Sequence, residues 1–157
     1  SGGPLIDLQG RVIGVNTAVT DGAQSLGFAL PSNAIQRAVD SMRKYGRIIR
    51  PWIGVRYIQV DADYAKRNAL PYTYGALVQR GQIRGDLAII PGSPADKAGL
   101  KENDLLLELN GKRLDIKHPL SSQVARFSPG DEITLKIFRA GEEKELKMTL
   151  EERKEIR

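Results

Sequence analysis

Several kinds of residue are scarce or missing in this chain of 157 residues, and each absence excludes a class of site. Cysteine is absent, which excludes disulfides, thiolate metal sites and a cysteine nucleophile. The only histidine, His118, excludes a cluster of histidines around a metal. No apolar run approaches the roughly 18 residues of a membrane-spanning helix. We therefore expect a chain that packs its core in water, without a metal, a cofactor or a membrane span.

A block of charge of one sign is also missing, although the formal net charge is +5. Basic and acidic residues are mixed, as in residues 142–145 and 151–154, and no run of aromatic residues accompanies them. This dispersed charge favours a protein that binds no nucleic acid. The alternative, a nucleic-acid binder, predicts that affinity for DNA falls steeply with salt.

The first 46 residues predict three strands followed by one amphipathic helix. Glycine and proline turns bound the strands, and a serine N-cap and a terminal glycine bound the helix. Charged residues fall between the apolar positions of the helix, so one face should pack and the other should face water. The predicted elements are strands over 5–7, 11–19 and 26–30, a helix over 32–46 with Ser32 as its N-cap, and a linker that follows.

The remaining residues predict shorter elements that alternate with turns. Ser93, Pro94 and Gly99 combine an N-cap, a first-turn proline and a terminating glycine, which is typical of a helix of little more than one turn. The predicted strands are 52–60, 75–79, 87–90, 104–109, 132–139 and 143–150, and the predicted helices are 61–69, 93–99 and 118–127, before a charged, frayed tail.

Blocks of residues along nearly the whole chain resemble one family. Ser1 to Leu5, Val12 to Ala18 and Gly27 to Ser32 resemble, in order and spacing, the end of the trypsin-like domain of HtrA (Deg) serine proteases. The rest resembles the PDZ domain of that family, in the blocks Ile53-Gly54-Val55, Pro91-Gly92-Ser93-Pro94-Ala95, Ala98-Gly99-Leu100 and Asp104-Leu105-Leu106.

The resemblance implies a fold that is mainly β with short helices. It implies the carboxyl-terminal fragment of a trypsin-like β-barrel over 1–31, a helix and linker over 32–50, an α+β PDZ domain over 51–151 and a charged tail over 152–157. Three strands cut from a barrel would expose an apolar face, which includes Val12, Val15, Leu26 and Phe28, so we expect another segment to cover it.

The same resemblance makes Ser1 the nucleophile and its N–H one donor of the oxyanion hole. The glycines that follow leave room for backbone amides to converge on the developing oxyanion. Residues Leu26, Gly27, Phe28 and Ala29 would hold the substrate backbone and wall an S1 pocket for small aliphatic side chains. The alternative for these four residues is a plain barrel strand.

No histidine or aspartate partner precedes Ser1 in this sequence. Trypsin-like enzymes place histidine, aspartate and serine in that chain order, so His118 is not the base and should lie near solvent. Because a serine without a base is a poor nucleophile near neutral pH, we expect no peptidase activity from this polypeptide alone. The alternative for the whole protein is a non-catalytic PDZ module that only binds peptides.

A PDZ domain adds a peptide as a strand to a sheet edge, and amides of a short loop receive the terminal carboxylate. Here that loop would be Trp52, Ile53, Gly54 and Val55, and residues 55–58 would pair with the peptide. The helix over 119–127 would form the opposite wall, with Val124 and Phe127 as the floor of an apolar pocket. The alternative for these two is an ordinary core position. Arg50 would either add charge beside the carboxylate or remain a solvated linker residue.

One segment departs from the pattern of the family, because residues 79–86 stand where the usual domain passes almost directly between strands. We expect a positively charged excursion there. For the whole protein the family implies protein quality control by cleavage of misfolded proteins. It also implies unfolded polypeptides and carboxyl-terminal peptides as partners, a homotrimer, and an extracytoplasmic location in the periplasm or cell envelope.

Overall fold

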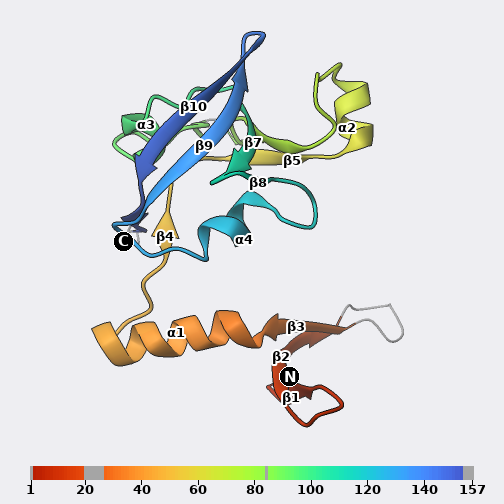
Figure 1. Cartoon of the computed structure of the whole chain (residues 1–157), viewed down its shortest axis with the longest axis vertical. Coiled ribbons are helices and arrows are strands. Elements are labelled where there is room, and N and C mark those ends of the chain that lie inside the picture. Colours follow the sequence, from red (N-terminus) through yellow and green to blue (C-terminus); the bar gives the residue numbers. More distant parts are fainter. Residues whose placement is uncertain (1, 20–26, 84, 154–157) are drawn as a thin grey trace. The chain divides into compact units, whose positions relative to one another are not determined.

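The chain divides into two compact units, residues 1–49 and 50–157. The computed structural model describes residues 2–19, 27–83 and 85–153. Figure 1 shows a small sheet with one long helix in the first unit and a larger sheet with short helices in the second. Each unit is therefore described by itself.

The first unit is an antiparallel three-stranded sheet followed by a helix. The strands β1 (Pro4–Ile6), β2 (Val12–Val19) and β3 (Gly27–Pro31) lie in the order β1-β2-β3. Helix α1 (Ser32–Tyr45) follows at once, and its N-cap is Pro31, which offers no side-chain hydrogen bond. The prediction of Ser32 as the N-cap was therefore wrong by one residue, whereas Gly46 ends the helix in the left-handed conformation as expected.

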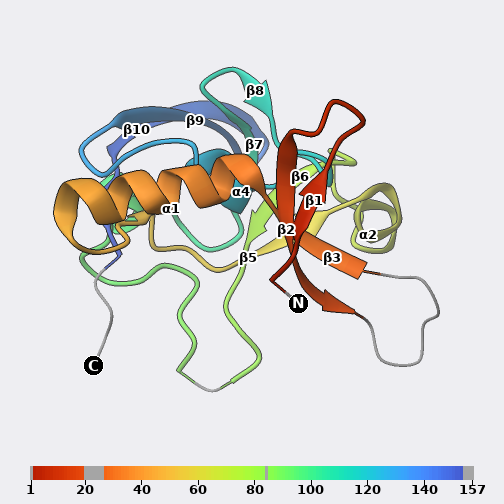
Figure 2. The same ribbon diagram turned by 90° about the horizontal axis from the view of Figure 1, so that it is seen from below.

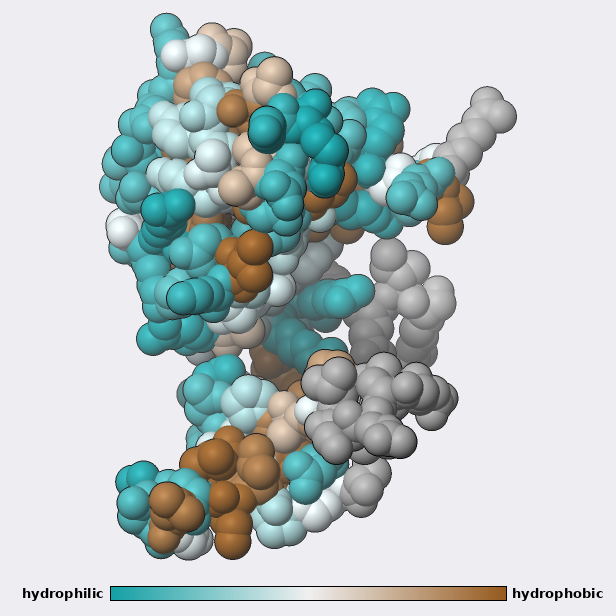
Figure 3. All heavy atoms as spheres, turned by 90° about the vertical axis from the view of Figure 1, so that its right-hand side faces the viewer, coloured by the Kyte–Doolittle hydropathy of each residue, from teal (hydrophilic) through white to brown (hydrophobic). Residues whose placement is uncertain are grey.

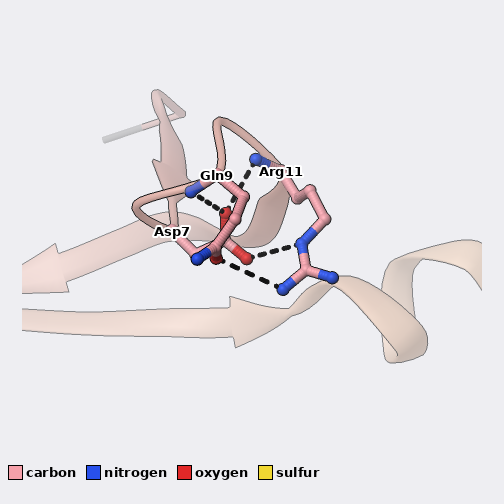
Figure 4. Close-up of polar contacts among 3 residues, drawn as sticks. All are labelled: Asp7, Gln9 and Arg11. Carbon is pink, nitrogen blue, oxygen red and sulfur yellow. Dashed lines mark hydrogen bonds and ion pairs between the residues drawn. The ribbon is translucent and has the colours of Figure 1, made fainter.

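The turn between β1 and β2 is organised by the carboxylate of Asp7 (Figure 4). Its Oδ1 accepts hydrogen bonds from the amides of Gln9, at 3.0 Å, and Arg11, at 2.9 Å. Its Oδ2 accepts a third from Nε of Arg11 at 2.7 Å. These bonds, led by the one from the Arg11 amide, lower the pKa of Asp7. An aspartate side chain thus organises the turn between the strands predicted over 5–7 and 11–19.

The second unit contains a six-stranded sheet and a two-stranded ribbon. The sheet has the order β10-β9-β7-β6-β5, with β8 paired to β7, and the ribbon pairs β11 with β4. The strands are β4 (Pro51–Trp52), β5 (Tyr57–Val60), β6 (Gly75–Val78), β7 (Leu105–Leu109), β8 (Lys112–Arg113), β9 (Glu132–Arg139), β10 (Glu142–Thr149) and β11 (Glu151–Glu152). The helices are α2 (Ala62–Arg67), α3 (Pro94–Lys97) and α4 (Leu120–Val124).

Apolar residues cover both faces of this sheet because successive strand residues point to opposite sides. Leu106 belongs to a large cluster with Val78 and with Leu120 and Val124 of α4. Leu105 and Leu107 belong to a smaller one with Val60 and with Ala65 of α2. The sheet is therefore held between α4 on one face and α2 on the other.

Four predicted elements of this unit differ from the structure. The helix expected over 118–127 is limited to Leu120–Val124, so Phe127 lies beyond its end. The single strand expected over 52–60 is interrupted at Gly54, whose φ of +82° breaks the extended path between β4 and β5. The strand expected over 87–90 forms only an isolated bridge between Val55 and Ile89. The tail expected to be frayed contributes Glu151 and Glu152 to β11, where they pair with Trp52 and Pro51.

Residues 79–83 and 85–86, which the resemblance predicted as an excursion, lie between β6 and the segment that pairs with Val55. In Figure 2 the chain between β6 and α3 extends away from the sheet. Both ends of this excursion form ion pairs with other parts of the unit. Arg80 donates two hydrogen bonds to Glu102, at 2.6 and 2.7 Å, and Arg56 forms an ion pair with Asp86 at 2.9 Å. Both ion pairs join this excursion to the body of the unit.

Candidate functional site

The 52–55 loop (Trp52, Ile53, Gly54 and Val55) uses two of its carbonyl groups in hydrogen bonds and leaves three of its amides without an acceptor among the described residues. The carbonyl oxygens of Ile53 and Gly54 accept bonds from the amides of Ala95 and Ile90, both at 2.9 Å. Within the described ranges, the amides of Ile53, Gly54 and Val55 donate to no acceptor. Three consecutive N–H groups therefore lack an acceptor in the described part of the chain, which is unusual for backbone amides in a folded domain.

Gly54 holds this arrangement because no other residue fits there. Its φ of +82° is one that residues with a side chain rarely adopt. A Cβ atom at Gly54 would lie 2.2 Å from Cβ of Ser93, which is buried and caps α3. The 52–55 loop is thus packed directly against the segment that begins α3.

The sheet edge beside the 52–55 loop belongs to β5, which pairs with β6 on its other side. Val124 and Phe127, the two residues predicted to floor an apolar pocket, lie in one cluster with Ile53 and Val55 of the loop. Ile53 and Val124 are each 6% exposed, and Val55 and Phe127 pack against the cluster half-buried. The structure therefore brings the loop, the start of β5 and α4 together around the same apolar side chains.

Two flanking residues take separate places. Trp52 lies in β4, and its ring edge would be 3.2 Å from a Cβ at Gly54, so it walls the loop from the side. Arg50 is exposed and its carbonyl oxygen accepts a hydrogen bond from the amide of Arg153 at 3.0 Å. Its side chain stays a candidate for added charge.

Sequence reasoning missed two features of this site. The contact of Gly54 with Ser93 joins positions 39 residues apart. Tyr57 also lies at the site, since its hydroxyl accepts a hydrogen bond from the amide of Ser121, the second residue of α4, at 3.2 Å. Because side chains alternate along a strand, Tyr57 lies on the same face as Val55. This spacing was the only feature of the sequence that could have indicated that Tyr57 lies at the site.

The residues predicted for catalysis lie in the first unit. Ser1 and Leu26 fall outside the described residues. The amide of Gly2 donates to the carbonyl of Asn16 at 2.7 Å, and Gly3 accepts from the amide of Asn16 at 2.9 Å. These bonds fasten the residues that follow Ser1 to β2.

Gly27, Phe28 and Ala29 lie in β3, which is the edge strand of the small sheet. The side chain of Phe28 is 59% exposed, and Ala29 is half-buried. Opposite the edge, the strand pairs with β2. Its outer backbone groups are thus placed where another strand could pair with them.

His118 lies far along the chain, just before α4. Its ring Nδ1 is 3.0 Å from Oδ1 of Asp115, and its backbone amide donates to the same oxygen at 2.8 Å. The ring is therefore part of a local turn. Across the described residues, no group of histidine, aspartate or glutamate side chains could hold a metal ion, and no helix has the length and hydropathy to cross a membrane.

Comparison with known proteins finds relatives that are named as periplasmic serine endoproteases. The chain is 38% identical over 153 residues to a protein of Chlamydia pneumoniae named probable periplasmic serine endoprotease DegP-like. The matched segment covers 96% of this chain and 30% of the relative. It is 34% identical over 156 residues to a protein of the same name from a Marinomonas species, covering 98% of this chain and 32% of that one. The chain thus spans about a third of the length of these curated relatives.

A solved structure gives the same result. The HtrA-type protease AlgW with a decapeptide matches 98% of this chain and 46% of its own, with a TM-score of 0.72 and 29% identity. The expected resemblance to HtrA-type proteases and the mainly β fold are confirmed, and the periplasmic names agree with the expected location. The family profile described as PDZ domain matches residues 51–150, and the chain belongs to the PDZ domain family.

Proposed function

We propose that the second unit binds the carboxyl-terminal ends of polypeptides at the 52–55 loop, with the peptide added as a strand along β5. The observation that carries the proposal is the set of three consecutive amides, from Ile53 to Val55, that donate to no acceptor in the described part of the chain. A terminal carboxylate accepts hydrogen bonds from such amides. The cluster around Ile53 and Val124 would surround the last side chain of the peptide.

The test is a titration of the chain with two peptides that differ only at their carboxyl end. Charge-assisted hydrogen bonds contribute about 1.5 to 3 kcal/mol each, so a peptide with a free carboxylate should bind at least about tenfold more tightly than its amide. Calorimetry measures both dissociation constants. Equal affinities would remove the reason for placing a carboxylate at the 52–55 loop.

For the whole protein we propose a serine endopeptidase of the HtrA type that cleaves misfolded proteins through a Ser-His-Asp mechanism. The names of the relatives support this activity. In this proposal residues 26–29 hold the substrate backbone. Unfolded polypeptides and carboxyl-terminal peptides are the partners, a homotrimer is the assembly and the location is extracytoplasmic.

The proposal also assigns the segments of the chain. Residues 1–31 would be the end of the protease domain, 32–50 a helix and linker, and 51–152 the PDZ domain, which includes Glu152 because that residue pairs with Pro51. The division of the chain after residue 49 and the domain match over 51–150 support the boundary near residue 50.

The catalytic part of the proposal is tested with a fluorophosphonate, which labels activated serines. We expect no labelling of residues 1–157 alone, because no histidine precedes Ser1 to accept its proton. Labelling that disappears in the Ser1→Ala variant would show instead that this chain activates the serine without the missing partners.

A further inference from the structure

Tyr57 joins β5 to α4 across the site. It follows Val55 by two residues, so its side chain lies on the same face of the sheet, where it packs half-buried against the cluster that contains Val124. Its hydroxyl oxygen is 3.2 Å from the backbone nitrogen of Ser121, which donates a hydrogen bond to it. We call this contact the Tyr57 crossbar.

The Tyr57 crossbar supplies a hydrogen-bond acceptor for a backbone amide in the first turn of α4, which has no acceptor within the helix itself. The first amides of a helix have no partner in the preceding turn, and a side-chain cap usually provides one. The N-cap here is Pro119, which has no such side chain. The amides of Ser122 and Gln123 donate to the carbonyl of Pro119, at 3.0 and 3.1 Å, and the amide of Ser121 donates to Tyr57. Tyr57 thus fixes the first turn of a five-residue helix against the edge strand.

The position of the crossbar defines which part of a bound peptide meets it. In a strand added along β5, every second peptide side chain faces α4. When the last side chain lies in the apolar cluster beside Ile53 and Val55, the third residue from the carboxyl end faces the same way, beside Tyr57. A bulky side chain at that position has to displace the tyrosine ring and leave the Ser121 amide without an acceptor, which costs binding free energy.

We propose that Tyr57 is a specificity-determining residue, which selects peptides with glycine, alanine or serine at the third position from their carboxyl end. This inference rests on the proposed binding of carboxyl ends at the 52–55 loop. It adds the substrate class, namely chain ends with an apolar last residue and a small residue two positions earlier.

The experiment titrates the full chain with four peptides of one sequence, which carry a free carboxylate and a leucine at the end. They differ only in having glycine, alanine, leucine or phenylalanine at the third position from the end. The wild-type chain should bind the first two about tenfold more tightly than the last two. In Tyr57→Phe the preference should fall to a few-fold, because the ring is no longer tied to α4, and in Tyr57→Leu it should vanish.

Hydrogen exchange provides a readout that does not depend on peptides. The amide of Ser121 should exchange faster in Tyr57→Phe than in the wild-type chain, while amides of β7 keep their protection. The matched control is Tyr64→Phe, since Tyr64 belongs to the cluster on the opposite face of the sheet. That variant should retain the tenfold preference.

The outcomes separate this inference from the proposed function. A wild-type chain that binds all four peptides equally, or a Tyr57→Leu variant that keeps the preference, overturns the role of Tyr57 and leaves carboxylate binding intact. Free and amidated peptides of equal affinity overturn the proposed function and this inference with it. Unchanged exchange of the Ser121 amide in Tyr57→Phe overturns the crossbar.

Discussion

The two units differ in where their apolar side chains lie. Every buried apolar side chain among the described residues belongs to the second unit, from Ile53 to Leu150. Of the fifteen large apolar side chains that are exposed in the described part of the chain, eleven belong to the first unit, among them Leu8, Phe28 and Met42. Figure 3 shows apolar atoms gathered on the surface of the first unit. Both units have regular strands and helices, so they do not differ in secondary structure. They differ in how many of their apolar side chains are buried.

This difference teaches that secondary structure and a stable core are separate properties of a segment. Helix α1 has apolar residues at helical spacing, yet none of its residues is buried. The sheet of the first unit likewise leaves Val12 and Phe28 more than half exposed, while Val15 is half-buried. These side chains need a further surface to bury them, as the sequence predicted for a piece of a barrel.

The largest expected effect comes from separating the units. Residues 50–157 should unfold cooperatively on heating, because they contain the buried core. Residues 1–49 should show no cooperative transition, since a three-stranded sheet and one helix without a buried core do not repay their conformational entropy. Circular dichroism on both fragments measures this. A cooperative transition in 1–49 would break the comparison.

A matched pair of leucines measures the same contrast within the intact chain. Leu106→Ala, at a position with no exposure, should lower the free energy of unfolding by about 2 to 5 kcal/mol. Leu30→Ala, at a side chain that is 53% exposed in the first unit, should change it by less than about 0.5 kcal/mol. Urea unfolding gives both values. Similar losses at the two positions would show that Leu30 is buried in solution.

The 52–55 loop offers a smaller and more local test. Gly54→Ala should weaken binding of a free-carboxylate peptide and destabilise the second unit by about 1 to 3 kcal/mol, because the added Cβ meets Ser93. Gly111→Ala is the matched control, with a φ of +74° and no atom within 4 Å of the added Cβ. It should be mildly strained and bind normally.

Removing the clash should restore part of the function. Because the closest atoms to the added Cβ are Cβ and Oγ of Ser93, the double variant Gly54→Ala with Ser93→Gly should recover binding relative to Gly54→Ala alone. Glycine is tolerated at an N-cap at a cost of a few tenths of a kcal/mol. If peptide titrations find no recovery, the contact with Ser93 does not govern the shape of the loop.

The smallest effect concerns two surface carboxylates, one in each unit. The Arg11 amide leads the contacts that lower the pKa of Asp7, and the Lys136 ammonium, then the Tyr72 hydroxyl, lower the pKa of Glu143. A carboxyl whose pKa is lowered on folding stabilises the fold above its unfolded pKa, and that contribution is lost as pH falls through the folded value. Both contributions should therefore begin to fall as pH drops to the ordinary values of 3.8 and 4.5, and they should be gone once pH lies below the lowered pKa of each carboxyl.

Carboxyl resonances followed by NMR during acid titration check this directly. In the fragment 50–157 Glu143 should keep its lowered pKa, whereas in 1–49 Asp7 should return to its ordinary one. Tyr72→Phe should raise the pKa of Glu143, because one of its hydrogen bonds is removed. A lowered Asp7 pKa in the isolated first fragment would show that the β1–β2 turn forms without further contacts.

Residue patterns predicted most elements because their signals are local. Ser93 caps α3 and Pro94 begins it, as the spacing indicated, and Gly46 ends α1. The resemblance also placed the loop residues Ile53 and Val55 near the helix residues Val124 and Phe127, and all four lie in one apolar cluster.

Other features could not be predicted because they depend on contacts between distant parts of the chain. The hydroxyl of Tyr57 and the amide of Ser121 are 64 residues apart, and neither residue type indicates the other. The pairing of Glu151 and Glu152 with β4 likewise runs against their charge, which suggested a solvated tail. Whether a charged residue joins a strand depends on the backbone partner beside it, and that partner is known only from the fold.

The ribbon of β4 and β11 holds the two ends of the second unit side by side. Backbone pairing joins Glu151 to Trp52, and Arg153 to Arg50. A force that pulls these two ends apart would break the backbone hydrogen bonds between β4 and β11 before it acted on the sheet. Trp52 belongs both to this ribbon and to the 52–55 loop. A force on the ends of the second unit would therefore act on this loop first.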